Sequence, residues 1–330
     1  MAIWTDEIKP VTLTVFARGI AERYDTDGLL ADIFPNTFVA DTRFEWVQGE
    51  KLNDVAEYRA FDAETVIGDS AGGVSRLASL APVGMKKRFS EYEKIRKSSP
   101  NSPESVQAAA ERLAAEVAKA TVNRVALLRG EAAATGALSI SENGFRQEVD
   151  FGRRADFTTT AANPWDGASA DPLADIEGWV SAFADANGEA PDRLVVSRKA
   201  AIALTKALYS QLTNPGPVFT QANANEILAG NGFPTMTVND RQFAGQRLLP
   251  EDVAVLASTN GAGATAWGTT AEADDPRYGL AGGADLPGLV VGAYEQDDPY
   301  TKWIRANATA LPILGNPDLT LAATVLSENP

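Results

Sequence analysis

The chain has 330 residues, no cysteine, no histidine and a formal net charge of −15. A chain of this length can bury a large core, in one large domain or in two to three smaller ones. Without cysteine there is no disulfide, thiol nucleophile or Cys-ligated metal, and without histidine the commonest general base near neutral pH is missing. These absences disfavour hydrolase triads, zinc sites and most acid–base enzymes. They favour a structural role.

The acidic charge is distributed unevenly. Residues 1–150 carry 18 Lys and Arg against 23 Asp and Glu, a net −5, and residues 151–330 carry 11 against 21, a net −10. Affinity for nucleic-acid phosphates needs patches of Lys and Arg, so this balance disfavours general nucleic-acid binding. An acidic surface keeps a protein soluble. It would also suit the wall of a container that holds DNA without adhering to it.

No targeting or membrane segment is expected. The first residues lack a basic region, and no apolar run approaches the roughly 20 residues that span a bilayer. We therefore expect the protein to be made and used in the cytoplasm.

An arm and an extended hairpin are predicted for the first part of the chain. Residues 1–40 carry only short elements, including an alternating run at 10–16 that indicates an edge strand. Residues 41–47 also alternate with period two, as half-exposed strands do, and residues 74–83 form a second strand-like run that is expected to break at Pro82. Two such strands around a long excursion predict a hairpin.

The excursion between these strands, residues 48–75, is polar, acidic and rich in glycine. A loop of this length is uncommon in a compact monomer unless it has a function. It has too little apolar area to hold its own shape, so we expect it to become ordered only against a neighbouring subunit. Its acids could there meet a basic cluster formed by Lys86, Lys87, Arg88, Lys94, Arg96 and Lys97.

A long helix is predicted over residues 103–129. Ser102 can cap it, Pro103 suits the first helical position, and Glu104 favours the positive end of the helix dipole. Apolar residues then recur at spacings of three and four, and Gly130 is expected to end the helix. Many alanines make it a slim rod of roughly 40 Å that neighbours can approach closely.

An extended connector leads from this helix to an α+β module. Residues 146–172 are polar and Thr-rich, and they include a strand-like step at 149–152. Trp165 lies between turn formers, and Asp171-Pro172 indicates the start of a helix.

Beyond the connector, short alternating elements predict helices beside a mixed sheet. The predicted helices cover 173–187, closed by Gly188, and 198–212, and the predicted strands are 194–196, 234–239, 252–258, 300–314 with a break at Pro312, and 319–326.

Candidate chemical sites are few, and each has a structural interpretation. The acid pairs at 274–275 and 297–298 could bind Ca²⁺ or Mg²⁺ or hydrolyse glycosides, but a proline follows each, which is typical of turns. The glycines at 261–263 and 282–283 lack the lysine or acid of a nucleotide-binding motif, so they indicate flexible loops.

Three basic or polar motifs stay open or are set aside. The basic patch at 86–97 includes Phe89 and Tyr92, which permits a nucleic-acid interpretation, but an interface with acidic neighbours or a solvated face are the alternatives. The Arg pair at 153–154 is ambiguous in the same way. Asn307 begins a glycosylation sequon, which occurs by chance where no secretory signal is present.

The order of these parts resembles the Hong Kong 97-type fold of tailed-phage major capsid proteins. The local patterns resemble the capsid protein E (lambda-type) family. The sharpest matches are residues 149–152, the step from Trp165 to Asp171-Pro172-Leu173, and Asp298-Pro299 followed by Ala310-Leu311-Pro312 and Asn316-Pro317. The resemblance implies an α+β fold with an N-arm at 1–40, an extended E-loop hairpin at 41–88, a P-domain at 89–165 with a spine helix at 103–129, an A-domain at 166–299, and return strands to the P-domain at 300–330.

The resemblance also implies a mechanical function. Copies would form the hexamers and pentamers of an icosahedral virion shell that encloses double-stranded DNA without sequence-specific binding, after assembly in the host cytoplasm. Portal, scaffolding and decoration proteins would be partners, and no membrane would be involved. The family implies no catalytic, cofactor-binding or metal-binding residue. Some relatives cross-link Lys to Asn, and Lys51 and Asn53 lie in the loop, but nothing in the sequence assigns that chemistry to them.

Two other functions stay open. An encapsulin-like nanocompartment shell protein shares the fold and would be distinguished by a cargo peptide rather than packaged DNA. An acidic, carboxylate-dependent hydrolase would use the aspartate pairs.

Overall fold

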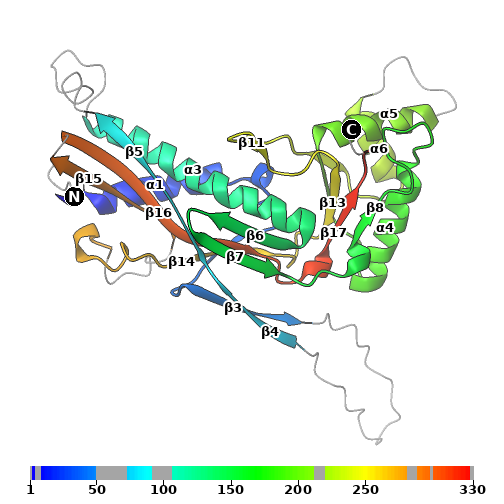
Figure 1. Cartoon of the computed structure of the whole chain (residues 1–330). Coiled ribbons are helices and arrows are strands. Elements are labelled where there is room, and N and C mark those ends of the chain that lie inside the picture. The colour runs from blue at the N-terminus through cyan, green and yellow to red at the C-terminus, as the bar shows by residue number, and fades with distance from the viewer. Residues whose placement is uncertain are drawn as a thin grey trace, which may run out of the picture.

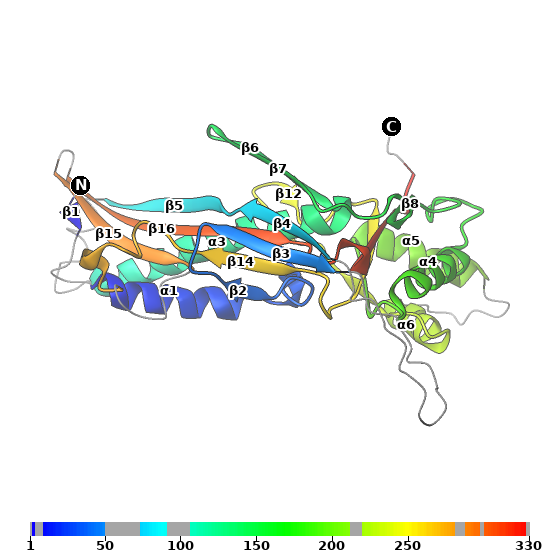
Figure 2. The ribbon, with the colours of Figure 1, turned by 90° about the horizontal axis from the view of Figure 1, so that it is seen from below.

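Two β-sheets and one long helix organise the chain (Figure 1). The computed structural model describes residues 2–3, 9–49, 73–90, 106–211, 220–280, 288–297 and 300–327. Figure 2 shows the elongated shape: a long sheet and two helices run from the N-terminal end of the molecule to a group of shorter helices at the other end. The architecture is α+β, as the sequence predicts.

The first sheet is built around its longest strand. β16 (Tyr300–Ile313) pairs on one side with β15 and then with β14, and on the other side with β5. α1 and α3 pack on this sheet, and Val117 of α3 and Ile304 of β16 share the buried cluster between the two layers. The remaining elements of this layer are β1 (Ala2–Ile3), α1 (Pro10–Tyr24), β2 (Asn36–Phe38), β5 (Ala81–Ser90), α3 (Val106–Thr135), β14 (Ala264–Gly268) and β15 (Val290–Asp297).

The second sheet has the order β10-β9-β13-β17-β8, in which β13 alone runs antiparallel to its neighbours. The connections β8–α4–β9 and β9–α5–α6–β10 step across the sheet in one direction, so right-handed crossovers place all three helices on one face. The elements are β8 (Thr158–Thr160), α4 (Pro172–Asn187), β9 (Arg193–Val196), α5 (Arg198–Gln211), α6 (Gln221–Gly230), β10 (Met236–Val238), β13 (Val253–Ala257) and β17 (Thr320–Thr324).

Hairpins extend from this body. Figure 1 shows the β3–β4 hairpin projecting away from both sheets, and Figure 2 shows the β6–β7 hairpin projecting on another side. The hairpins are β3 (Arg43–Gly49) with β4 (Gly73–Ser79), β6 (Ala137–Glu142) with β7 (Phe145–Asp150), and β11 (Gln242–Phe243) with β12 (Gln246–Arg247). Short 3₁₀ turns occur at Asp27–Leu29, Ala155–Phe157, Pro276–Tyr278 and Pro317–Leu319.

Several sequence predictions are confirmed. The alternating run at 41–47 forms β3, and the runs at 194–196, 234–239 and 252–258 form β9, β10 and β13. Asp171 caps α4 by accepting a hydrogen bond from the Ala174 amide, and Gly188 closes that helix in the left-handed conformation. The polar excursion lies outside the described residues except for its two ends.

The predicted edge strand at residues 10–16 is wrong, because these residues open helix α1. Pro10 occupies the first turn, where its missing N–H costs nothing. Leu13, Thr14 and Ala17 are buried at helical spacing, and the Thr14 hydroxyl donates to the Val291 carbonyl oxygen at 2.9 Å. The alternation of β-branched residues is typical of a strand, but packing of the buried positions against the sheet stabilises a helix here.

The predicted end of the long helix at Gly130 is also wrong. α3 continues to Thr135, and Gly136 follows it with φ of +72°. Gly130 lies inside the helix, and a Cβ at this position would be 1.7 Å from the Leu248 carbonyl oxygen, so a larger residue would not fit there. The glycine therefore permits a close approach of two backbones. Residues 103–105, where the helix is predicted to begin, lie outside the described residues.

Neither proline breaks its strand. β5 runs through Pro82, which lies opposite Thr309, and the interruption between β4 and β5 falls at Leu80 instead. β16 runs through Pro312, opposite Thr265 of β14. The pairing of β16 with β5 ends at Ala310, before Pro312. Within the described residues, the lack of an N–H at Pro312 therefore removes no hydrogen bond to β5.

The sequence boundaries and the sheets divide the chain differently. β14 and β15 fall within residues 166–299, yet they belong to the first sheet with β16. β17 falls in the tail, but it pairs with β13 and β8 in the second sheet. Helix α6 and strand β6 were not predicted.

Candidate assembly surfaces

One face of the projecting β3–β4 hairpin rests on the body. Trp46 lies 6.3 Å from Phe151 between ring centroids. Arg76 donates from Nη1 to the Asp150 carbonyl oxygen at 3.3 Å, and Gln147 donates from Nε2 to the Ser79 carbonyl oxygen at 2.6 Å. Strand register places Phe44, Trp46 and Arg76 on this same side. The base of the hairpin is thus held to β7 by aromatic contact and hydrogen bonds.

The opposite face of the hairpin is exposed and partly apolar. The side chains of Val47 and Leu77 are 66% and 60% exposed. They share this face with Glu45, which accepts a hydrogen bond from the Ser75 hydroxyl at 2.6 Å. Large exposed aliphatic groups on a projecting element are typical of a surface that is covered in an assembly.

The N-terminal segment is anchored to α3 by a buried polar network. The Arg129 side chain is fully buried, and its Nε donates to the Thr265 hydroxyl at 2.8 Å. Its Nη groups donate to both carboxylate oxygens of Asp25 and to Asn36 Oδ1. Asn36 Oδ1 also accepts from Trp267 Nε1 at 2.7 Å. The network joins α1, β2, α3 and β14, so the N-terminal segment is a fixed part of the first layer.

The two arginines at 153–154 have separate structural roles. Arg153 donates to the Ala133 and Ala134 carbonyl oxygens at 2.8 and 2.9 Å, which are among the last carbonyls of α3. Burial lowers the pKa of the Arg153 guanidinium to about 10. The negative charge of Asp318 raises this pKa and offsets part of the shift. Arg154 instead pairs with Asp156 at 2.8 Å at the surface. A nucleic-acid role for this pair has no support in the geometry.

The described part of the basic cluster is divided by the pleat of β5. Lys87 faces α3 and pairs with Glu116 at 2.5 Å, which lowers the pKa of that carboxyl through the hydrogen bond. Lys86 and Arg88 lie on the outer face, where Lys86 sits 4.7 Å from the centre of the Trp303 ring. The members at positions 94, 96 and 97 lie outside the described residues, as do Lys51 and Asn53.

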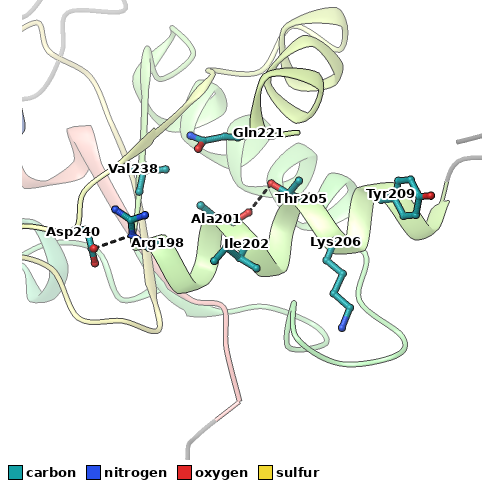
Figure 3. Close-up of a pocket in the computed structure, with 9 residues that line it drawn as sticks. All are labelled: Arg198, Ala201, Ile202, Thr205, Lys206, Tyr209, Gln221, Val238 and Asp240. Carbon is teal, nitrogen blue, oxygen red and sulfur yellow. Dashed lines mark hydrogen bonds and ion pairs between the residues drawn. The ribbon is translucent and has the colours of Figure 1, made fainter. Parts of the chain in front are cut away.

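A hollow of about 700 Å³ opens on α5 (Figure 3). Ile202 and Tyr209 line it and are 61% and 38% exposed. At one end Arg198 donates to Asp240 at 2.8 Å, and Arg247 donates to the other oxygen of that carboxylate at 2.8 Å. The hydrogen bond from Arg198 and then that from Arg247 hold the pKa of Asp240 below its usual value.

The candidate chemical residues are engaged in local structure. Asp275 accepts from the Arg277 side chain and backbone in a 3₁₀ turn, and the side-chain bond lowers the pKa of Asp275. The Asn307 amide of the sequon, on β16, donates to Glu272 in the turn that follows β14, at 2.5 Å. Gly263 packs on the Phe34 ring. Of the other acid pair, Asp297 ends β15 and residue 298 is not described; residues 282–283 are not described either.

Two further features are absent from the described part of the chain. No group of three or more Asp or Glu side chains is placed to hold a metal ion there. No helix in those same ranges is both long and apolar enough to cross a bilayer.

The chain belongs to the family described as phage major capsid protein E, whose model matches residues 29–325. This confirms the resemblance drawn from the sequence. The role of the protein is therefore that of a structural capsid component. No curated protein sequence matches the chain.

Solved structures show that the fold is of the Hong Kong 97 type. A phage-related protein from Bordetella bronchiseptica RB50 is similar with a TM-score of 0.62 and 15% identity, over 98% of this chain and 99% of that one. A protein assigned as a prophage capsid protein from Escherichia coli CFT073 has a TM-score of 0.59 and 15% identity, over 96% and 99%. The SrpI encapsulin from Synechococcus elongatus PCC 7942 has a TM-score of 0.53 and 10% identity, over 92% and 89%.

Proposed function

We propose that this protein self-assembles into the hexamers and pentamers of an icosahedral shell around the double-stranded DNA of a tailed phage. The observation that carries the proposal is the projecting β3–β4 hairpin, whose apolar outer face has no cover within the described part of its own chain. A neighbouring subunit would bury that face. Many such contacts, each above about 1,000 Å², would close a shell.

The parts of the subunit would divide this work. Residues 1–40 would serve as an N-arm, 41–88 as the E-loop that lies over a neighbour, and 89–165 with α3 as the P-domain. Residues 166–299 would supply most of the A-domain at the capsomer centre. The first layer supports moving α1, β2, β5, β14 and β15 to the P-domain, and the second sheet supports moving β17 to the A-domain.

Portal, scaffolding and decoration proteins are further partners of the proposed shell. Assembly would take place in the host cytoplasm, and the finished protein would reside in the virion. No catalytic step is needed for this role, and the engagement of Asp275 by Arg277 gives no support to the hydrolase alternative.

The similarity to an encapsulin favours one second candidate, a nanocompartment shell protein that encloses protein rather than DNA. The contents of the particle discriminate the two. Shells purified from infected or induced cells would carry DNA under the first proposal and a cargo protein under the second.

The test of assembly is direct. The protein is overexpressed, and its particles are examined by light scattering and negative-stain electron microscopy. We expect closed shells, tubes or capsomer rings. A monodisperse species of 34.9 kDa at high concentration and at varied salt would contradict the proposal.

A further inference from the structure

The helical layer on the second sheet is electrically asymmetric. Residues 155–192, which include α4, contain eight Asp or Glu and no Lys or Arg. Residues 193–211, which include α5, contain four Lys or Arg and no Asp or Glu. Arg193 pairs with Asp32 and Arg198 with Asp240, so the basic charge of α5 comes from the exposed Lys199 and Lys206. The acidic charge on the surface of α4 comes from the exposed Glu177 and Asp185. Charge separated in this way within a subunit favours contacts between unlike flanks of two copies.

The basic side carries the features of an interface centre. Arg198, Ile202, Lys206 and Tyr209 follow one another at helical spacing along the exposed side of α5 (Figure 3). The hollow beside them is completed by Gln221 of α6 and by Val238 of β10. Ile202 and Tyr209 are the apolar and aromatic residues of this stripe, and Arg198 and Lys206 are its cations. Aromatic residues and arginine are enriched at the centres of protein interfaces.

The acidic surface on α4 carries mostly small side chains. The exposed positions of α4 combine the carboxylates of Glu177 and Asp185 with the small residues Gly178, Ser181 and Ala182. Its bulky residues Ile176 and Phe183 are turned into the core. Small side chains let a partner helix approach closely, and the two carboxylates lie eight residues apart, about two turns, along that approach.

These two surfaces lie on different sides of the layer. α4 connects from β8, at one edge of the second sheet, whereas the hollow on α5 opens beside β10, at the other edge. Figure 1 shows α5 and α4 toward opposite ends of the group of helices. Two unlike surfaces on opposite flanks make a head-to-tail contact, and repeated rotation about one axis closes such contacts into a ring.

We infer that the α5 stripe of one copy docks on the acidic α4 stripe of the next copy, so that charge complementarity sets the order of subunits around a capsomer. Lys206 would face Glu177 of the neighbour, while Arg198 stays paired with Asp240 of its own chain. Ile202 would be covered by the small residues of the partner helix. This inference rests on the proposed function and names the surfaces through which the ring forms.

The absence of cysteine from the sequence permits a clean cross-linking test. Full-length Ile202→Cys and Ser181→Cys variants, with different affinity tags, are co-assembled and oxidised. We expect disulfide-linked heterodimers at least about tenfold above homodimers of either variant. Val15→Cys, at a side chain 63% exposed on α1, replaces Ile202→Cys in the matched control and should give no such excess.

Charge exchange supplies a second readout. Lys206→Glu should reduce the assembled fraction by about tenfold, since it opposes like charges at each contact. Adding Glu177→Lys in the same chain should restore assembly, because every contact then has the reversed pair. A loss caused by misfolding would not be rescued in this way, and failure of rescue with the fold intact would overturn the docking.

The outcomes separate the two levels of proposal. If the unmodified protein forms shells but the heterodimers do not exceed the control, the α5–α4 docking is overturned and the capsid proposal stands. If the unmodified protein stays monomeric, the proposed function fails and the docking fails with it.

Discussion

Arg129 and Asp25 form a bidentate ion pair inside the protein, with Nη1–Oδ1 and Nη2–Oδ2 distances of 2.5 and 2.9 Å. Their side chains are 0% and 3% exposed. The pair links α3 to the residue that caps the C-terminal end of α1. Because the guanidinium also donates to Thr265 and Asn36, its desolvated charge is fully engaged.

Removing one partner of this pair should be costly. Arg129→Met leaves the Asp25 carboxylate buried without its cation, and we expect the free energy of unfolding to fall by about 3–5 kcal/mol. Urea titration of the unassembled subunit measures the change. Arg124→Met, which removes a surface pair with Glu142, is the control and should cost at most about 1 kcal/mol. Equal losses in both variants would contradict the structural role of the network.

The close approach at Gly130 gives a second prediction. Gly130→Ala should destabilise the subunit by about 1–3 kcal/mol or more, because the new methyl group meets the Leu248 carbonyl oxygen. Gly19→Ala, in the interior of α1 with no atom within 4 Å of the added Cβ, is the matched control. It should stabilise by about 0.5–1 kcal/mol through helix propensity. If both substitutions stabilise the subunit, then α3 at position 130 does not lie in contact with the Leu248 carbonyl oxygen.

These two sites show what the sequence could and could not predict. Periodicity over a few residues predicts β3 and α4, because each pattern is local and each has its own turn or cap. The role of Gly130 depends on a carbonyl that is distant in sequence, so the local pattern predicts a helix end at this glycine instead. Arg129 is equally ambiguous in sequence, since a cation near a helix end normally lies in solvent.

The candidate surfaces were predicted to different degrees. The hairpin was expected from the alternation of its strands, and its outer face follows from the register. The hollow on α5 was not expected, because its walls come from three elements that only the fold brings together. The sequence predicts the basic cluster as one patch, but the pleat of β5 places Lys87 beside Glu116, on the opposite face of the strand from Lys86.

The Lys87–Glu116 pair should make stability depend on pH. The hydrogen bond from Lys87 lowers the pKa of Glu116, so the folded state favours the ionised carboxyl. This contribution is present above the pKa that Glu116 has in the unfolded chain, and it is lost as pH falls through the lowered folded value. The difference in unfolding free energy between the natural subunit and Glu116→Gln should therefore shrink as the pH falls below the ordinary Glu pKa of 4.5. A difference that grows on acidification would contradict this assignment.

The charge distribution predicts weak contact with DNA. The purified protein, with a net charge of −15, should not retard duplex DNA at about 0.15 M salt. Lys87 is paired with Glu116, which leaves less free positive charge on β5 than the sequence suggests. Gel retardation over a salt series is the measurement. Tight binding that weakens steeply with salt would mean that residues 86–97 act as a nucleic-acid surface.

The outer face of the β3–β4 hairpin provides the sharpest test of assembly. Leu77 is 60% exposed and lies opposite Glu45, so Leu77→Asp should lower the free energy of unfolding of the free subunit by no more than about 1 kcal/mol, through repulsion between the two carboxylates. In a shell, position 77 would be covered by a neighbouring subunit. A carboxylate buried there without a partner would weaken every contact between subunits. We therefore expect normal subunits that fail to form closed shells in negative-stain micrographs.

Ser141→Asp is the control for this substitution, because it adds the same charge to an exposed position of the β6–β7 hairpin. It should leave the yield of shells unchanged. If Leu77→Asp unfolds the subunit, the side chain has a role within its own chain. If closed shells form normally with Asp at that position, the outer face of the hairpin is not an assembly surface, and the contact that closes the shell must lie elsewhere on the subunit.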